Sequence, residues 1–199
     1  MFIFRRLAQL SRRRKILLGL ATLFVASGIF IYFWLFADLP SIDRLQAGLA
    51  LPSTRIYDRN GQLLYEILPS EGGRNTALPL SDVPQHCVQA VIATEDANFY
   101  NHPGVDITGI IRALWIDLRG GEILAGGSTI TQQVARNLLF DPEQRAERSL
   151  RRKLRESILA LQLQNAYSKD DVLALYLNQS YFGNLAYGIE GAARAYFGK

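Results

Sequence analysis

The longest hydrophobic stretch of the chain spans residues 16–37, a run without a single charged residue. At about 1.5 Å per residue, a helix of this length extends about 33 Å, which exceeds the bilayer core of about 30 Å. Tyr32 and Trp34 near its far end are typical of a membrane interface. The pattern therefore predicts one transmembrane helix over residues 16–37.

A cleaved signal peptide is the competing interpretation, because such peptides also begin with basic residues and an apolar run. Their apolar core is shorter and ends in small residues, whereas this stretch ends Trp34-Leu35-Phe36-Ala37. We therefore favour an uncleaved signal anchor.

Basic residues cluster ahead of the hydrophobic stretch, in a tail over residues 1–15. The chain has net charge +4, with 22 bases and 18 acids, but six of the bases and no acid precede Asp38. Beyond the anchor the balance is thus slightly acidic, which argues against a nucleic-acid-binding surface. The tail predicts a cytoplasmic N-terminus, with everything from Asp38 onward on the outer side of the membrane. The six bases are Arg5, Arg6, Arg12, Arg13, Arg14 and Lys15.

Residues 38–83 are interpreted as a stalk and linker that contain one β-hairpin. Two β-favouring runs within residues 53–67 flank Asn60-Gly61, a strong hairpin-turn signal. A loop is expected over residues 71–75. Ser81 or Asp82 is the expected N-cap of the next helix, with Pro84 in its first turn.

From residue 84 to residue 199 the pattern is helical almost throughout. Helices are expected to begin at Asp106 and Lys169, and the longest covers residues 143–167. Cys87 lies at an apolar helical position and is expected in the core. The fold class is therefore mainly α. The apolar stripes expected to face the core carry Ile107, Ile110, Ile111, Leu114 and Trp115 in one helix and Leu150, Leu154, Ile158 and Leu161 in another.

Two adjacent carboxylates, Glu95 and Asp96, stand where a helical pattern runs into an aromatic turn containing Phe99 and His102. Aromatic walls can partly desolvate a carboxylate, which raises its pKa and suits it to proton transfer near neutral pH. Glu95 is therefore the first candidate for a catalytic base. An isolated pair of this kind is more often ordinary solvated surface, so its weight depends on the rest of the chain.

A glycine-containing segment precedes another predicted helix. Gly126-Gly127 is followed by Ser128 and Thr129 as possible caps, and Gln132 is placed to complete a capping box with Thr129. Free N–H groups at such a helix start favour an anion. A simple turn and cap is an equally good interpretation.

The predicted helix over residues 143–167 carries a cationic face that contains one acid, Glu156. Such faces are usually only solvated, and Arg152 with Glu156 fits an ordinary i,i+4 pair. The alternative is a surface that holds a multiply charged phosphate. The bases of this face are Arg148, Arg152, Lys153 and Arg155.

Five segments occur in the order EDANFYNHPG, GGSTITQQ, RRKLRE, KDDVLALYLNQSYFG and GAARAYFGK. They closely resemble the five motifs of the family fifty-one peptidoglycan glycosyltransferases, the module of class A penicillin-binding proteins and monofunctional transglycosylases. The resemblance implies a lysozyme-like, mostly helical fold with a large lobe and a smaller, membrane-dipping jaw. It also implies polymerisation of lipid II into glycan strands, with inversion at the sugar and release of undecaprenyl pyrophosphate.

The resemblance also implies roles for individual residues. Glu95 matches the base that takes the proton from the 4-hydroxyl of the acceptor sugar, and Glu156 matches a second glutamate near the donor pyrophosphate. The positions that line the donor and phosphate region are Ser128, Thr129, Gln132, Gln133, Arg136, Arg152 and Lys153. Other motif positions, with partly structural roles, are Asp96, Phe99, His102, Asn178 and Lys199.

No tightly bound cofactor and no protein-held metal ion is expected; Mg²⁺ or Mn²⁺ would come with the substrate pyrophosphate. The implied partners are lipid II, the growing glycan strand, membrane lipid and other cell-wall synthesis and division proteins. Nucleic acid is not among them.

Two departures from the family pattern bear on these expectations. Lys199 coincides with the end of the fifth motif, so we expect the domain to be truncated at its C-terminus. No S-x-x-K, K-T-G or S-D-N motif occurs, so no transpeptidase is predicted within these residues. The alternatives to a glycosyltransferase are a lysozyme-like enzyme that cleaves glycan and releases soluble muropeptides, and an inactive membrane-anchored scaffold.

Overall fold

The computed structural model describes residues 11–49, 51–69, 73–120 and 127–198. The chain divides into two compact units, Met1–Leu39 and Pro40–Lys199. In the first unit, α2 (Arg12–Phe36) is one apolar helix without a buried residue. By length and composition it could cross a membrane, a property that anchors share with signal sequences. It covers nearly the whole span predicted from the hydrophobic pattern.

The second unit is mainly helical, as the sequence pattern predicts, with a two-stranded hairpin and a second pair of very short strands. Its first elements are the 3-10 helix η1 (Ile42–Gly48), β1 (Thr54–Tyr57), β2 (Leu63–Ile67), β3 (Arg74–Asn75), η2 (Leu80–Asp82), α3 (Gln85–Glu95), η3 (Phe99–Asn101) and α4 (Ile107–Gly120). They are followed by α5 (Ile130–Leu139), α6 (Pro142–Ala146), α7 (Leu150–Ala166), α8 (Lys169–Gln179), β4 (Ala186–Tyr187) and α9 (Gly188–Phe197).

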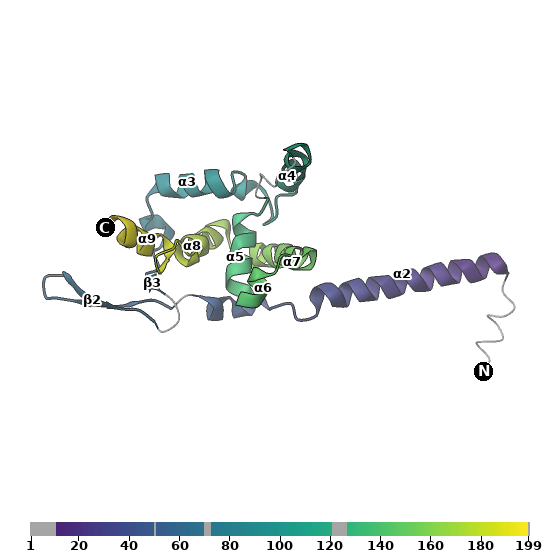
Figure 1. Ribbon diagram of the computed structural model, residues 1–199, viewed down its shortest axis with the longest axis horizontal. Coiled ribbons are helices and arrows are strands. Elements are labelled where there is room, and N and C mark those ends of the chain that lie inside the picture. The colour runs from purple at the N-terminus through teal and green to yellow at the C-terminus, as the bar shows by residue number, and fades with distance from the viewer. Residues whose placement is uncertain (1–10, 50, 70–72, 121–126, 199) are drawn as a thin grey trace. The chain divides into compact units, whose positions relative to one another are not determined.

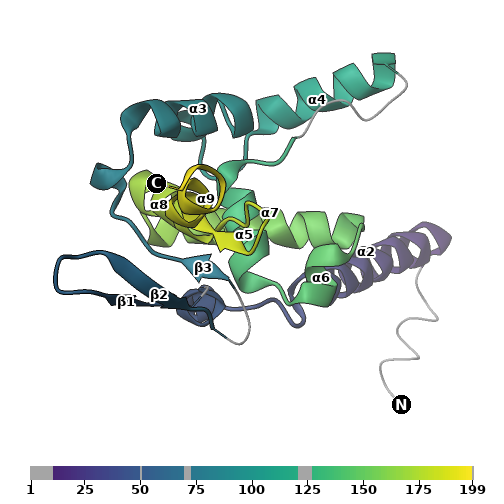
Figure 2. The ribbon, with the colours of Figure 1, turned by 60° about the vertical axis from the view of Figure 1, so that its left-hand side comes forward.

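The core of this unit surrounds α5, which packs against α7, α8 and η1. In both ribbon views, α3 and α4 lie on one side of the group formed by α5, α7 and α8, and the hairpin lies on the other (Figure 1; Figure 2). The fully buried apolar side chains include Phe99, Ile130, Leu159, Leu163, Leu173 and Leu177.

The start of α5 is fixed by a capping box, as predicted. The Thr129 hydroxyl accepts the backbone N–H of Gln132, and the Gln132 side-chain oxygen accepts the backbone N–H of Thr129. The same hydroxyl donates to the carbonyl of Gly104 at 2.6 Å. Gly104 has φ 100°, and a Cβ there would lie 2.7 Å from the carbonyl oxygen of Ala160, so this close approach requires glycine. The helix start is thus fastened to the loop that follows η3.

The predicted hairpin is confirmed, with Ile56 opposite Tyr65 and the turn at Asn60-Gly61. Gly61 has φ 82°, and the Asp58 carboxylate accepts the N–H of Asn60, which closes the turn. A parallel pairing of β3 with β4 was not predicted, and β3 lies where a loop was expected. Strands of two residues carry no alternating pattern that a sequence could reveal.

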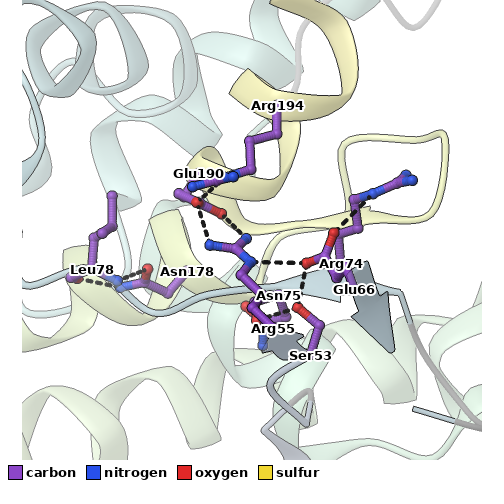
Figure 3. A network of polar contacts seen from close by, with 9 residues as sticks. All are labelled: Ser53, Arg55, Glu66, Arg74, Asn75, Leu78, Asn178, Glu190 and Arg194. Carbon is purple, nitrogen blue, oxygen red and sulfur yellow. Dashed lines mark hydrogen bonds and ion pairs between the residues drawn. The ribbon is translucent and has the colours of Figure 1, made fainter. Parts of the chain in front are cut away.

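Ion pairs tie the hairpin to α9 (Figure 3). The Arg55 guanidinium donates two hydrogen bonds of 2.8 Å to the Glu190 carboxylate and one of 3.0 Å to Glu66. Glu66 also accepts the Ser53 hydroxyl at 2.6 Å and pairs with Arg74 at 3.3 Å. We call Arg55, Glu66 and Glu190 the hairpin clasp. The apolar side chains of the hairpin stay exposed, namely Ile56, Tyr57, Leu64, Tyr65 and Ile67.

The long helix expected over residues 143–167 is instead two helices, because α6 ends at Ala146 and Ser149 caps α7 by accepting the N–H of Arg152. The apolar stripe predicted to face the core is also wrong: Leu150 is 71% exposed and Leu154 39%. The buried face of α7 carries polar as well as apolar residues, namely Arg155, Glu156, Leu159, Ala160 and Leu163.

Two further expectations on the other side of α5 are corrected. Ser81 and Asp82 belong to the 3-10 helix η2, and α3 begins at Gln85 after Pro84 as its N-cap. Three of the α4 residues expected to face the core, Ile107, Ile111 and Trp115, are exposed instead. Cys87 is half-buried.

Candidate active site

An open pocket of about 180 Å³ lies where α3 ends, α4 begins and α5 begins. Residues 93–98 form one wall, and Gly127, Ser128 and Thr129 form another. Asp106, just before α4, and Gly109 and Arg112 in its first half complete the lining. Motif residues that lie far apart in the sequence therefore share one cavity.

Glu95, the last residue of α3, lies in the pocket lining and is exposed to solvent. One of its carboxylate oxygens accepts a hydrogen bond of 2.8 Å from the side-chain amide of Gln133 on α5. The aromatic residues expected as walls around Glu95 do not line the pocket, and Phe99 is fully buried. Glu95 is therefore fixed on one side and open to a ligand on the other.

Asp96 and His102 fasten the turn that follows Glu95. Each Asp96 oxygen lies 3.0 Å from Nε2 of His102, and one of them also accepts the backbone N–H of Ile130 at 3.1 Å. Nδ1 of His102 accepts the N–H of Gly104, which leaves Nε2 as the ring nitrogen that donates to Asp96. These bonds join the end of α3 to the first turn of α5.

At the start of α5, where the sequence suggested an anion site, three backbone N–H groups have internal partners. Thr129 donates to Gln132, Ile130 donates to Asp96, and Gln132 donates to the Thr129 hydroxyl. The turn-and-cap interpretation is therefore the correct one for these three groups. Any negative charge bound nearby must be met chiefly by side chains.

Glu156 lies behind the pocket and is completely buried. One oxygen accepts Lys153 Nζ at 2.6 Å, and the other is paired with the Arg152 guanidinium. Lys153 Nζ also donates to the Ser128 hydroxyl at 2.6 Å, and a third of its side chain remains exposed. The sequence predicted that Glu156 lies on an open cationic face, but the side chain is buried and holds two cations, Arg152 and Lys153. Lys153 in turn reaches Ser128 in the pocket wall.

The remaining predicted residues lie outside the pocket lining. Gln132 is buried and donates to the Ser157 hydroxyl at 2.8 Å, and Arg136 is half-buried on α5. The Asn178 side chain binds the backbone of Leu78 (Figure 3). Its oxygen accepts the Leu78 N–H and its amide donates to the Leu78 carbonyl, both at 2.8 Å. Lys199 lies outside the described residues.

Sequence reasoning missed the contribution of α4 to the pocket. Asp106, Gly109 and Arg112 recur at every third position, away from the apolar stripe of the helix, and this spacing was the available signal. Hydrogen bonds from Thr108 and from the Gly109 N–H lower the pKa of Asp106, so this carboxylate is ionised at neutral pH. Among the described residues, no group of three or more His, Cys, Asp or Glu is placed to hold a metal ion.

Comparison with known proteins agrees with this architecture. Residues 60–199 match a family model described as transglycosylase. The chain belongs to this family, the glycosyltransferase module of class A penicillin-binding proteins. The resemblance recognised in the five motifs is thereby confirmed. At the level of the family, the domain is a peptidoglycan glycosyltransferase.

Several curated relatives are penicillin-binding protein 1A. The protein from Aquifex aeolicus is 35% identical over 189 residues, which cover 94% of this chain and 25% of the relative. The protein from Pseudomonas aeruginosa is 42% identical over 169 residues (84% and 20%), and that from Mycobacterium tuberculosis is 40% identical over 188 residues (94% and 22%). The chain thus spans a quarter or less of the length of these relatives.

Proposed function

We propose that this chain polymerises lipid II into glycan strands, with Glu95 as the general base. The observation that carries the proposal is the position of Glu95 in an open pocket, held by Gln133 and accessible to a sugar hydroxyl. The carboxylate takes the proton of the acceptor 4-hydroxyl as that oxygen attacks the anomeric carbon of the donor. A positioned base typically contributes about 10²- to 10⁴-fold in rate.

The leaving group places the larger electrostatic demand on the site, because the negative charge of undecaprenyl pyrophosphate must be stabilised as it departs. Lys153, which reaches the Ser128 side of the pocket, is placed to meet this charge. Glu156 holds Lys153 there and is itself paired with Arg152, so Glu156 acts as a positioning residue. Mg²⁺ or Mn²⁺ would enter with the substrate pyrophosphate and add positive charge.

Inversion at the sugar follows from the use of one carboxylate. A retaining enzyme needs a second carboxylate as nucleophile, about 5–5.5 Å from the first. The neighbouring Asp96 is occupied by His102 and the Ile130 N–H, so it is poorly placed to attack carbon. Direct displacement by the acceptor hydroxyl is therefore the favoured path.

The membrane supplies the lipid-linked substrate. We infer that α2 anchors the chain, with the basic tail in the cytoplasm and the catalytic domain outside the cytoplasmic membrane of a bacterium. The exposed apolar side chains of α4 suit contact with lipid beside the pocket. Cell-wall synthesis and division proteins would be the partners of the enzyme in the cell.

The test is incubation of the chain, in detergent with a divalent cation, with labelled lipid II, followed by sizing of the product. Long glycan strands are expected, and intact sacculi treated in parallel should release nothing. Release of soluble muropeptides from sacculi would instead establish a glycan-cleaving enzyme. No product from either substrate would establish an inactive scaffold.

A further inference from the structure

A lysine on α8 lies in an unusual place beneath the active-site turn. Lys169 is the first residue of α8, and its Nζ is buried with no hydrogen-bond partner among the described residues. The ammonium lies 4.4 Å from the centre of the Phe99 ring, within cation–π range. An ammonium group without a hydrogen bond is costly to bury, so this arrangement needs an explanation.

The surroundings oppose the positive charge of Lys169. The N-terminal end of a helix carries partial positive charge and is unfavourable for a cation. Burial lowers the pKa of Lys169 from 10.5, and attraction to Asp96 only partly offsets this effect. Because the folded chain binds this proton less tightly than the unfolded chain, the charged form lowers stability at neutral pH. A methionine would fill the same space without this cost.

The groups near the Lys169 ammonium, Phe99 and Asp96, indicate its role. Phe99 is fully buried and forms the base of the turn, and Asp96 follows Glu95 directly in the chain. The Asp96 carboxylate accepts hydrogen bonds from both the His102 ring and the Ile130 N–H. Lys169 attracts both the ring face of Phe99 and the Asp96 carboxylate. Its charge is therefore placed to keep the residue after Glu95 in position.

We propose that Lys169 is a positioning residue for the general base, retained at the expense of stability because its charge fixes the Phe99 and Asp96 side of the active-site turn. The inference rests on the proposed function of Glu95. It extends the site to α8, whose first residue neither lines the pocket nor reaches the substrate. A residue retained only for packing would lower stability and activity together when replaced.

The deciding variants are Lys169→Met, which removes the charge and keeps the volume, and Lys169→Arg, which restores a cation over the ring. Lys169→Met should lower kcat by about 10- to 100-fold, since a displacement of about 1 Å costs up to about 10²-fold, while KM changes little and Tm is unchanged or raised. Lys169→Arg should recover most of the lost rate. Tyr100→Phe is the matched control: it removes an exposed hydrogen bond of 3.0 Å to Asp170 at the same junction and should leave kcat unchanged.

The pH profile adds a readout specific to the charge. The titratable groups around Lys169 are Asp96, His102 and Tyr100 on the turn and Asp170 and Asp171 on α8. Deprotonation of Lys169 should make kcat fall on the alkaline side, below pH 10.5, in the wild type. The arginine variant should keep its rate to higher pH, and the methionine variant should lack this alkaline step.

A fluorine NMR measurement separates this inference from the proposed function, because it needs no activity. With 4-fluorophenylalanine in the chain, the Phe99 signal, assigned by its loss in Phe99→Leu, should titrate with Lys169 and should not titrate in Lys169→Met. A Phe99 signal that ignores pH, wild-type kcat in Lys169→Met, or a parallel loss of Tm and kcat would each overturn the inference. A wild-type chain that makes no strands would overturn the proposed function instead.

Discussion

Glu95 and Glu156 come from two of the motifs, yet they lie in opposite environments. Glu95 is exposed in the pocket and bonded to a neutral amide, whereas Glu156 is completely buried between Arg152 and Lys153. An open carboxylate can accept a proton from a ligand, but a carboxylate enclosed by two cations is committed to holding them. The difference teaches that the environment, and not the residue type, divides the roles of paired acids.

The largest expected effect is the loss of activity when Glu95, the exposed carboxylate, is replaced. Glu95→Gln keeps the size of the side chain and removes the base, so the rate of strand formation should fall by about 10²- to 10⁴-fold. Stability should change by less than about 0.5 kcal/mol, because the side chain is exposed. Gel sizing of the lipid II product, with urea unfolding of the same samples, measures both. Retention of most of the activity would show that Glu95 is not the base.

For Glu156, the buried carboxylate, the main expected effect is on stability. Glu156→Ala leaves Arg152 and Lys153 without their shared anion and should lower the free energy of unfolding by about 3–5 kcal/mol. Glu143→Ala, at an exposed position of α6, is the matched control. Denaturant unfolding checks the change. A loss of unfolding free energy no larger than that of the control would mean that the ion pairs of Glu156 do not stabilise the fold.

The capping residue of α5 lies next to Ser128, between the two carboxylate environments. Thr129→Ala removes the cap and the bond to the Gly104 carbonyl, which should cost about 1–2 kcal/mol of stability. Thr129→Ser keeps the hydroxyl and should retain most of the stability. Thermal unfolding of both variants provides the test, and equal losses would show that the hydroxyl is unimportant.

A smaller effect is expected from the amide that orients Glu95. Gln133→Leu removes one hydrogen bond of about 0.5–1.5 kcal/mol, so kcat should fall by about two- to tenfold. Steady-state rates on lipid II measure this change. A fall as large as that of Glu95→Gln would mean that Gln133 does more than orient the base.

Glu190 of the hairpin clasp offers a second enclosed carboxylate, between Arg55 and Arg194. Burial alone would raise its pKa, but hydrogen bonds from both arginines lower it below 4.5. Its contribution to stability is therefore present above pH 4.5 and is lost as the pH falls through the lower, folded-state value. The protection factors of β1 and β2 against hydrogen exchange should fall in this acidic range. Glu190→Gln should show the low protection already at neutral pH, and full protection in that variant would contradict the role of the clasp.

The features that could be predicted from the sequence are those that depend on residues close together in the chain. The Thr129–Gln132 capping box and the turn at Asn60-Gly61 depend on a few consecutive residues, and both are confirmed. The mainly α class follows in the same way from helical spacing. The short motifs also led directly to the family.

The features that could not be predicted depend on contacts between distant segments. Helical spacing alone predicted that the Leu150 stripe of α7 faces the core. In the structure the opposite face, which carries the ion-paired Glu156, is buried, and α7 packs against α5. No local pattern shows that Glu95 is exposed while Phe99, four residues further on, is fully buried. The place of Arg112 in the pocket likewise requires the arrangement of α4 beside α5.

The most direct measurement is a structure of the chain with an unreactive lipid II analogue. We expect the 4-hydroxyl of the acceptor sugar within about 2.6–3.2 Å of a Glu95 oxygen, pyrophosphate oxygens against Lys153, and no atom of the analogue touching Glu156. A sugar hydroxyl bound away from Glu95, or a pyrophosphate in direct contact with an opened Glu156, would contradict it.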